Sequence, residues 1–203
     1  MIIDNFNLIK PLFYFNESNN MFFHCQLITR KKDNNFSNKV IKSYLILSKE
    51  HLESLKEEII LLCKHFNARA YINILGKDFG NVNKALLATI SNTVVNDTIN
   101  CLNPLKIFNK VVGSTTSRLS RFIIDIDNLS LKDSILEWLD EYFNCNKMDS
   151  SIKFLYATIP TVNGVHLITK PFDREKFSNI FPSVDVHKNS MGTLLYYDNN
   201  QNL

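Results

Sequence analysis

In the C-terminal part of the chain, hydrophobic patterns typical of strands and of helices alternate, and they predict the order of the secondary-structure elements. Strands are predicted by the period-two hydrophobic segments 121–127, 152–159, 165–169 and 184–187. Helical spacing predicts a helix after the first strand, capped by Ser130, and another after the third, ending before Pro182. Between the second and third strands, Asn163-Gly164 is typical of a tight hairpin turn. The pattern therefore predicts the order β-α-β-β-α-β, followed by an extra strand at 193–197.

This order is that of the ferredoxin-like or RNA-recognition-motif (RRM) topology. We expect an α+β protein in which an RRM-like unit at 113–203 is joined to a smaller N-terminal α/β module at 1–112. The segment 102–120 contains Pro104, Gly113 and the polar run STTS and shows no clear helix or strand pattern, so we place the boundary there. The two units together are short enough to form one compact domain. In the N-terminal module the sequence predicts a hairpin of strands 21–29 and 40–47, a helix capped by Ser48, a strand at 68–75 and a helix at 82–100.

Composition and charge exclude several classes of protein. With 45% hydrophobic and 21% charged residues, the chain is neither a disordered protein nor a disulfide-dense secreted scaffold. A net charge of +3 means that any contact with nucleic acid must use a local patch. The four scattered cysteines include no CxxC zinc half-site, which favours free thiols in a reducing compartment. We find neither a signal-peptide pattern nor a run of about 18 apolar residues, so we expect a cytoplasmic protein with no membrane partner.

Two carboxylates stand out in the strand predicted at 121–127. Asp125 and Asp127 are two residues apart, so their side chains lie on the same face of the strand. Asp125 also interrupts an apolar run, where an unpaired carboxylate would be costly. A nearby cation would stabilise such a pair, and oxygen ligands suit Mg²⁺ or Mn²⁺. The alternative is that Asp127 and Asn128 simply end the strand in a turn.

The strand predicted at 165–169 adds a histidine to these carboxylates. His166 and Lys170 share one face of that strand, where they could bind phosphate oxygens, and Gly164 would let a ligand approach the backbone closely. The alternative is an edge-strand histidine beside a solvated lysine.

A third carboxylate, Asp185, shares a strand face with His187, although alternation of this kind also suits a half-exposed strand. Together, three carboxylates and a histidine predict a two-metal nucleotidyl-transfer site in which the carboxylates hold the metals. In that scheme His166 and Lys170 hold the triphosphate.

Three segments in this order, IIDIDN, NGVHLI and SVDVHK, resemble the three motifs of the archaeo-eukaryotic primase superfamily, the primase-polymerases common in phages and plasmids. The resemblance implies that Asp125, Asp127 and Asp185 bind divalent metal and that His166 contacts the incoming nucleotide, these four being the catalytic residues. The sequence departs from the family pattern at Gly164, where a serine is usual, and it contains no zinc knuckle or helicase domain.

The resemblance also implies an activity and a set of partners. The activity is a metal-dependent transfer that joins nucleoside triphosphates to a 3′-hydroxyl on a nucleic-acid template. The partners are a nucleoside triphosphate, a single-stranded DNA or RNA template and a separate replicative helicase. If the protein is phage-encoded, its compartment is the cytoplasm of a bacterial host cell.

Three further residues are candidates for binding nucleotide. Arg69 and Asn73 lie with Tyr71 on one face of the strand at 68–75, although a solvated strand face would look the same. Arg118 lies in a hydroxyl-rich segment just before the first carboxylate, where the alternative is a flexible polar loop.

Two other functions fit the same residues. A non-catalytic nucleic-acid-binding or host-interaction protein could be built on a degenerate primase fold. A metal-dependent nuclease could use the same carboxylates to activate water.

Overall fold

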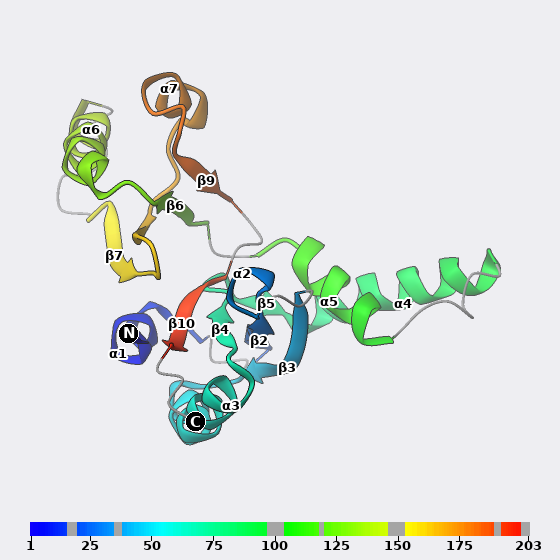
Figure 1. Ribbon diagram of the computed structural model, residues 1–203. Coiled ribbons are helices and arrows are strands. Elements are labelled where there is room, and N and C mark those ends of the chain that lie inside the picture. Colours follow the sequence, from blue (N-terminus) through cyan, green and yellow to red (C-terminus); the bar gives the residue numbers. More distant parts are fainter. Residues whose placement is uncertain are drawn as a thin grey trace.

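The computed structural model describes residues 1–15, 20–34, 38–96, 104–117, 120–145, 153–188 and 192–199. The protein is a mixed α+β structure with two antiparallel sheets (Figure 1), as expected for the α+β class. Arg118, one of the predicted nucleotide-binding residues, and Cys101 lie outside the described residues.

The first sheet has the strand order β1-β10-β4-β2-β3, with the short β5 paired to the start of β2. These strands are β1 (Ile2–Asp4), β10 (Thr193–Asp198), β4 (Arg69–Ile72), β2 (Met21–Thr29), β3 (Lys39–Ile46) and β5 (Lys77–Asp78). The pairing of β2 with β3 confirms the predicted N-terminal hairpin. The connection between them contains a short helix, α2 (Lys31–Asn34).

Helix α3 (Lys49–Phe66) covers one face of the first sheet. It begins where the sequence predicted, because the Ser48 side chain accepts a hydrogen bond from the backbone N–H of His51 at 3.0 Å. The side of α3 that faces the sheet is apolar, and its Leu52, Ile59 and Cys63 are buried in the main core.

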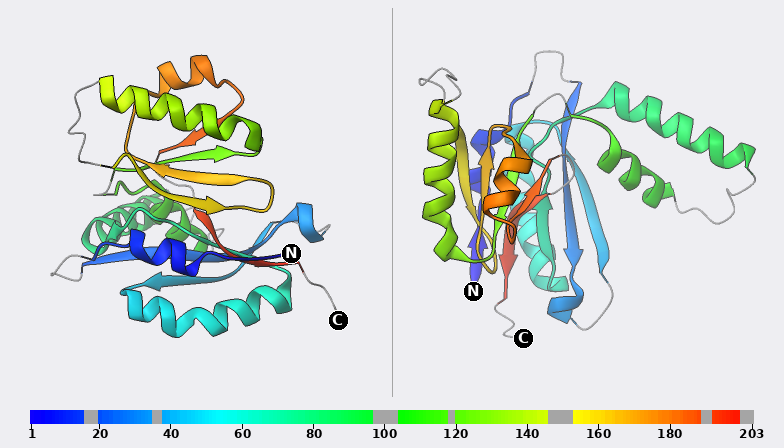
Figure 2. Two further views of the ribbon diagram at one scale, coloured as in Figure 1. Left: turned by 90° about the vertical axis from the view of Figure 1, so that its left-hand side faces the viewer. Right: turned by 90° about the horizontal axis from the view of Figure 1, so that it is seen from above.

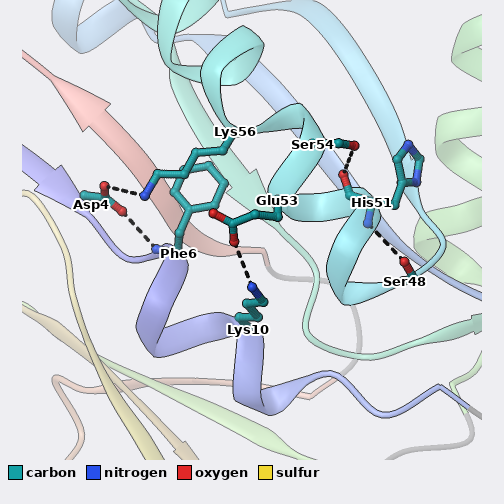
Figure 3. Close-up of polar contacts among 8 residues, drawn as sticks. All are labelled: Asp4, Phe6, Lys10, Ser48, His51, Glu53, Ser54 and Lys56. Carbon is teal, nitrogen blue, oxygen red and sulfur yellow. Dashed lines mark hydrogen bonds and ion pairs between the residues drawn. The ribbon is translucent and has the colours of Figure 1, made fainter.

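The N-terminal segment is held against α3. Figure 3 shows α1 (Phe6–Ile9) and the 3₁₀ turn that follows it, η1 (Lys10–Leu12), beside the first turns of α3. Lys10 pairs with Glu53 at 2.8 Å, and Lys56 pairs with Asp4 at 3.2 Å while lying over the Phe6 ring. Surface ion pairs of this kind contribute about 0–1 kcal/mol each. The buried side chains of Phe6, Ile9 and Leu12 therefore stabilise this contact more than the ion pairs do.

Helices α4 (Phe79–Val95) and α5 (Pro104–Ser114) pack on each other and project away from the sheets (Figures 1 and 2). The prediction that the segment 102–120 has no regular secondary structure is therefore wrong over α5. Pro104 is compatible with the first position of a helix, and Val111 and Val112 are buried against Phe22 and Val82.

The second sheet has the strand order β7-β8-β6-β9. Its strands are β6 (Phe122–Ile126), β7 (Leu155–Pro160), β8 (Val165–Thr169) and β9 (Asp185–His187), and its helices are α6 (Lys132–Cys145) and α7 (Arg174–Ile180). The chain order β6-α6-β7-β8-α7-β9 is the predicted one. The cap differs: Asn128 accepts from the N–H of Ser130, which lies inside a 3₁₀ turn, η3 (Leu129–Leu131), before α6.

The two faces of the second sheet have different neighbours. Ile124, Ile126 and Leu167 pack against α6 and α7 in an aromatic-rich core. The alternate residues Ile123 and Ile168 join the core of the first unit instead, through α1 and β10. In Figure 2, α6 and α7 lie on the outer side of the second sheet and α3 on the outer side of the first, so the sheets form the inner layers.

Strand β10 links the two units. The sequence groups 193–197 with the C-terminal unit, whereas in the structure β10 pairs with β1 and β4 in the first sheet. All six of its residues are buried. The segment from β6 to β9 is therefore inserted between α5 and the last strand of the first sheet, and the expected boundary at 112/113 falls inside α5.

No described helix is both long enough and apolar enough to cross a membrane. The three described cysteines, Cys25, Cys63 and Cys145, are free thiols. Burial raises the pKa of the Cys25 and Cys63 thiols, so both remain protonated.

Candidate functional site

Three residues from the three sequence motifs lie side by side in the second sheet. Asp125 in β6 is directly opposite His166 in β8 on one side and Asp185 in β9 on the other. Directly opposed residues in antiparallel strands point to the same face, with Cβ atoms about 5 Å apart. His166 Nε2 lies 3.3 Å from Asp125 Oδ1. Residues predicted separately on three strands therefore form one row across the sheet.

Asp127 is positioned by the close approach of β6 and the β7–β8 turn. It follows the last residue of β6 and is exposed. A Cβ atom on Gly164 would lie 1.9 Å from the backbone oxygen of Ile126 and 3.0 Å from the Cα of Asp127. Only glycine fits at position 164, because any side chain would collide with the end of β6. We expected Gly164 to let a ligand approach the backbone closely, but the backbone of β6 occupies that space.

His166 is held from both sides of its ring. Its Nδ1 lies 3.0 Å from the hydroxyl of Thr193 in β10, opposite the Nε2 that faces Asp125. His166 is 3% exposed and Thr193 is 0% exposed. Both ring nitrogens already have protein partners, so the ring orients Asp125 and ties the second sheet to the first.

The surroundings of Asp125 favour its charged form. The hydrogen bond from His166 holds the pKa of Asp125 below its usual range, and electrostatic interactions with His166, His187 and Arg30 lower it further. Partial burial opposes these effects without overcoming them. Asp125 is therefore a fixed negative charge at neutral pH.

Two cavities meet at these carboxylates. The inter-sheet cavity, about 130 Å³, is lined by Asp125, Asp127 and His166 from one side and by Arg30 and Arg69 from the other. The acidic cavity, about 250 Å³, is lined by Asp125, Asp127, Asp185, Asn128 and neighbouring residues. Asp125 and Asp127 line both cavities, so the same two carboxylates face two separate openings.

The first sheet presents a polar face toward the inter-sheet cavity. Arg69 and Tyr71 line that cavity, as their predicted shared face requires. The Arg69 guanidinium donates two hydrogen bonds to Asp33, at 2.7 and 2.6 Å, and lies 4.7 Å from the centre of the Tyr197 ring. Both members of the ion pair are largely buried. Arg69 is thus held by protein groups at the wall of the cavity.

The other predicted nucleotide-binding residues are not brought to the inter-sheet cavity. Asn73 lines a different, adjoining cavity, and its side-chain oxygen accepts from the N–H of Leu75 at 2.8 Å. Lys170 follows the far end of β8, four residues from His166, which is roughly 13 Å along a strand. It lines neither the inter-sheet nor the acidic cavity.

Arg30 is the cation that the sequence prediction missed. It follows β2, donates a hydrogen bond to the Tyr71 hydroxyl at 3.0 Å and lines the inter-sheet cavity. The alternation of His24, Gln26 and Ile28 indicates the face on which Arg30 lies. Arg30 faces Asp125 across the cavity because the two sheets pack on each other. The alternation of residues along β2 does not predict that packing.

Within the described part of the chain, no group of three or more His, Cys, Asp or Glu side chains is arranged to hold a metal ion. The oxygen donors are nevertheless of the kind that Mg²⁺ and Mn²⁺ prefer, because three carboxylates line the acidic cavity. The donor chemistry therefore fits the expected metals, while the side chains would have to approach one another to bind one.

Comparison of the chain with protein-family models, with curated proteins and with solved structures finds no significant match. A functional assignment therefore rests on the geometry of the site and on the three motifs.

Proposed function

We propose that the protein is a metal-dependent nucleotidyltransferase of primase-polymerase type, which joins nucleoside triphosphates to a 3′-hydroxyl on a nucleic-acid template. The observation that carries this proposal is the row of His166, Asp125 and Asp185 across three adjacent strands. Asp127 borders the same two cavities as Asp125. Residues from three distant motifs meet at one place, as a shared site requires.

The arrangement of the second sheet supports an RRM-like unit. The strand order β7-β8-β6-β9, with α6 and α7 packed on one face, places the first and third strands of the unit at its centre. Together with the three motifs, this arrangement favours membership of the archaeo-eukaryotic primase superfamily.

In the proposed reaction, Asp125, Asp127 and Asp185 would hold Mg²⁺ or Mn²⁺. Such ions lower the pKa of an attacking hydroxyl and neutralise the charge of the leaving pyrophosphate. The protein's own contribution is to keep Asp125 charged and oriented through His166 and Thr193.

Positive charge stands across the cavity from the carboxylates. Arg30 and Arg69 line the opposite wall, and arginine is well suited to phosphate oxygens. Arg69 is already paired with Asp33, so Arg30 is the better candidate for direct contact with a triphosphate.

The test is thermal unfolding of the full chain with Mn²⁺, with and without a nucleoside triphosphate. The variants are Asp125→Asn/Asp127→Asn and, as a matched control that also removes two charges, Asp133→Asn/Glu137→Gln on the exposed side of α6. Ligand at 100 times its dissociation constant stabilises by about 2.7 kcal/mol. We expect a shift that needs both metal and triphosphate, is kept in the control and is lost in the site variant.

A template-directed primer-extension assay then separates the alternatives. Extension that depends on metal and triphosphate supports the proposal. Degradation of nucleic acid with metal alone would assign a nuclease instead. Nucleic-acid binding that is indifferent to Asp125→Asn/Asp127→Asn, with no thermal shift, would contradict any catalytic use of this site.

A further inference from the structure

A third cavity, about 370 Å³, adjoins the inter-sheet cavity and lies between the first sheet and α5. We call it the amide cavity, because Gln26, Asn73 and Asn109 line it beside His24. Its volume falls within the range of small-molecule sites. Arg30 is its only lining residue with a full charge at neutral pH among the described residues, so its inner wall is polar but neutral.

Two buried polar atoms in this wall have no hydrogen-bond partner among the described residues. They are Nε2 of His24 and Oδ1 of Asn109. His24 is 7% exposed, on the sheet, while Asn109 comes from α5. Buried polar atoms are nearly always paired, and leaving one unpaired is destabilising. Two unpaired atoms on one cavity leave it with hydrogen-bonding capacity that a bound molecule with matching groups would satisfy.

The chemistry of the wall indicates what kind of ligand this is. Burial, with a contribution from the nearby charge of Lys77, lowers the pKa of His24 to about 4, so its imidazole is neutral at physiological pH. A neutral imidazole and side-chain amides offer both donors and acceptors without charge. Such groups suit the edge of a nucleobase, which asparagine and glutamine read by hydrogen bonding.

The amide cavity and the inter-sheet cavity share two residues. Arg30 and Tyr71 line both and are hydrogen-bonded to each other at 3.0 Å. A ligand lying across this junction would have a neutral, hydrogen-bonding part in the amide cavity and an anionic part beside Arg30. The carboxylates lie beyond, on the far wall of the inter-sheet cavity.

We propose that the amide cavity holds the base of a nucleotide whose phosphates lie in the inter-sheet cavity. This inference rests on the proposed function, because it takes the ligand of the inter-sheet cavity to be a nucleoside triphosphate. It assigns His24 and Asn109 to recognition of the base, and Arg30 to the phosphates.

Binding of the base and of the phosphates can be measured separately. The probes are the ribo- and deoxyribonucleoside triphosphates and, as a base-free ligand, inorganic tripolyphosphate, each titrated calorimetrically with Mn²⁺. Wild type should bind at least one nucleotide about tenfold or more tightly than tripolyphosphate, the size of one good set of base contacts.

Two variants block the amide cavity by different means. Asn109→Leu removes the unpaired oxygen and should leave the fold as stable or more stable. Gly113→Leu adds a side chain at a lining position where a Cβ atom meets no heavy atom within 4 Å. The matched control is Asn83→Leu on the exposed side of α4. Both cavity variants should lose the preference for nucleotide over tripolyphosphate while binding tripolyphosphate as wild type does, and the control should keep it.

The outcomes separate this inference from the proposed function. If both cavity variants keep the wild-type preference, the base lies elsewhere and the inference is overturned, while the proposed function stands. Equal affinity of wild type for tripolyphosphate and every nucleotide overturns it in the same way. If neither class of probe binds wild type, the proposed function fails and the inference fails with it.

Discussion

The Nδ1 atom of His166, in the second sheet, lies 3.0 Å from the hydroxyl of Thr193, in the first. Both residues are buried, and they are 27 positions apart in the chain. The other ring nitrogen of His166 faces Asp125. The imidazole of His166 therefore connects β10 of the first sheet to Asp125, the central carboxylate of the candidate site. The position of Asp125 thus depends on how the two sheets are packed.

Removing the Thr193 hydroxyl should weaken both stability and the site. Thr193→Val keeps the shape of the side chain but leaves Nδ1 of His166 buried without a partner, which costs about 1–3 kcal/mol. Thr193→Ser keeps the hydroxyl and serves as the control. Urea unfolding should show the loss in the valine variant, together with a smaller thermal shift from Mn²⁺ and nucleotide. Equal behaviour of the two variants in both measurements would show that the hydrogen bond does not support the site.

Asp185→Asn should have opposite effects with and without metal. Asp185 is directly opposite Asp125 on the neighbouring strand, and like charges in that position are destabilising. In the absence of metal, the substitution should therefore raise the free energy of unfolding by about 0.5 kcal/mol. It should also reduce the stabilisation by Mn²⁺, because a carboxylate ligand is lost. A variant that is less stable without metal, or that responds to Mn²⁺ as wild type does, would argue against this role of Asp185.

Gly164→Ala should displace the end of β6. The new Cβ atom would meet the backbone oxygen of Ile126 at 1.9 Å, and backbone cannot move aside as a flexible side chain can. We expect a loss of about 1–3 kcal/mol, measured by denaturant unfolding, and weaker nucleotide binding because Asp127 moves. Gly113→Ala is the control for stability alone, because Gly113 lines the amide cavity: its Cβ has open space in a helix, where alanine is favoured by up to about 1 kcal/mol. If both substitutions cost the same, the close approach at Gly164 does not position Asp127.

The buried His24 should make stability depend on pH. Its pKa is lowered from 6.5 to about 4 in the folded protein. Between these values the unfolded chain binds more protons than the folded one, so the free energy of unfolding falls as the pH falls from 6.5 to 4. The shift corresponds to roughly 3 kcal/mol at the acid end of that range.

The measurement for His24 is the free energy of unfolding as a function of pH in wild type and in His24→Gln. The variant should lose stability more gradually on acidification. His65→Gln, which replaces an exposed histidine, should follow the wild-type curve. Parallel curves for wild type and His24→Gln would show that His24 is not held neutral by burial.

The elements that sequence patterns predicted best are those with strong local signals. The strand at Met21–Thr29, the hairpin around Asn163-Gly164 and the Ser48 cap of α3 were all found where they were expected. Helix α5 was missed because Gly113 and the β-branched Val111 and Val112 lower local helix propensity. Burial of those valines against another helix and the sheet outweighs that preference.

The sequence by itself determined which residues share a strand face. Period-two alternation placed Asp125 with Asp127, and Arg69 with Tyr71, because successive side chains of a strand point in opposite directions. Only the tertiary structure decided that β10 completes the first sheet, that Asp33 pairs with Arg69, and that Arg30 stands opposite Asp125. These relationships join residues far apart in the chain, so they follow from which surfaces bury each other, and a local pattern does not specify that choice.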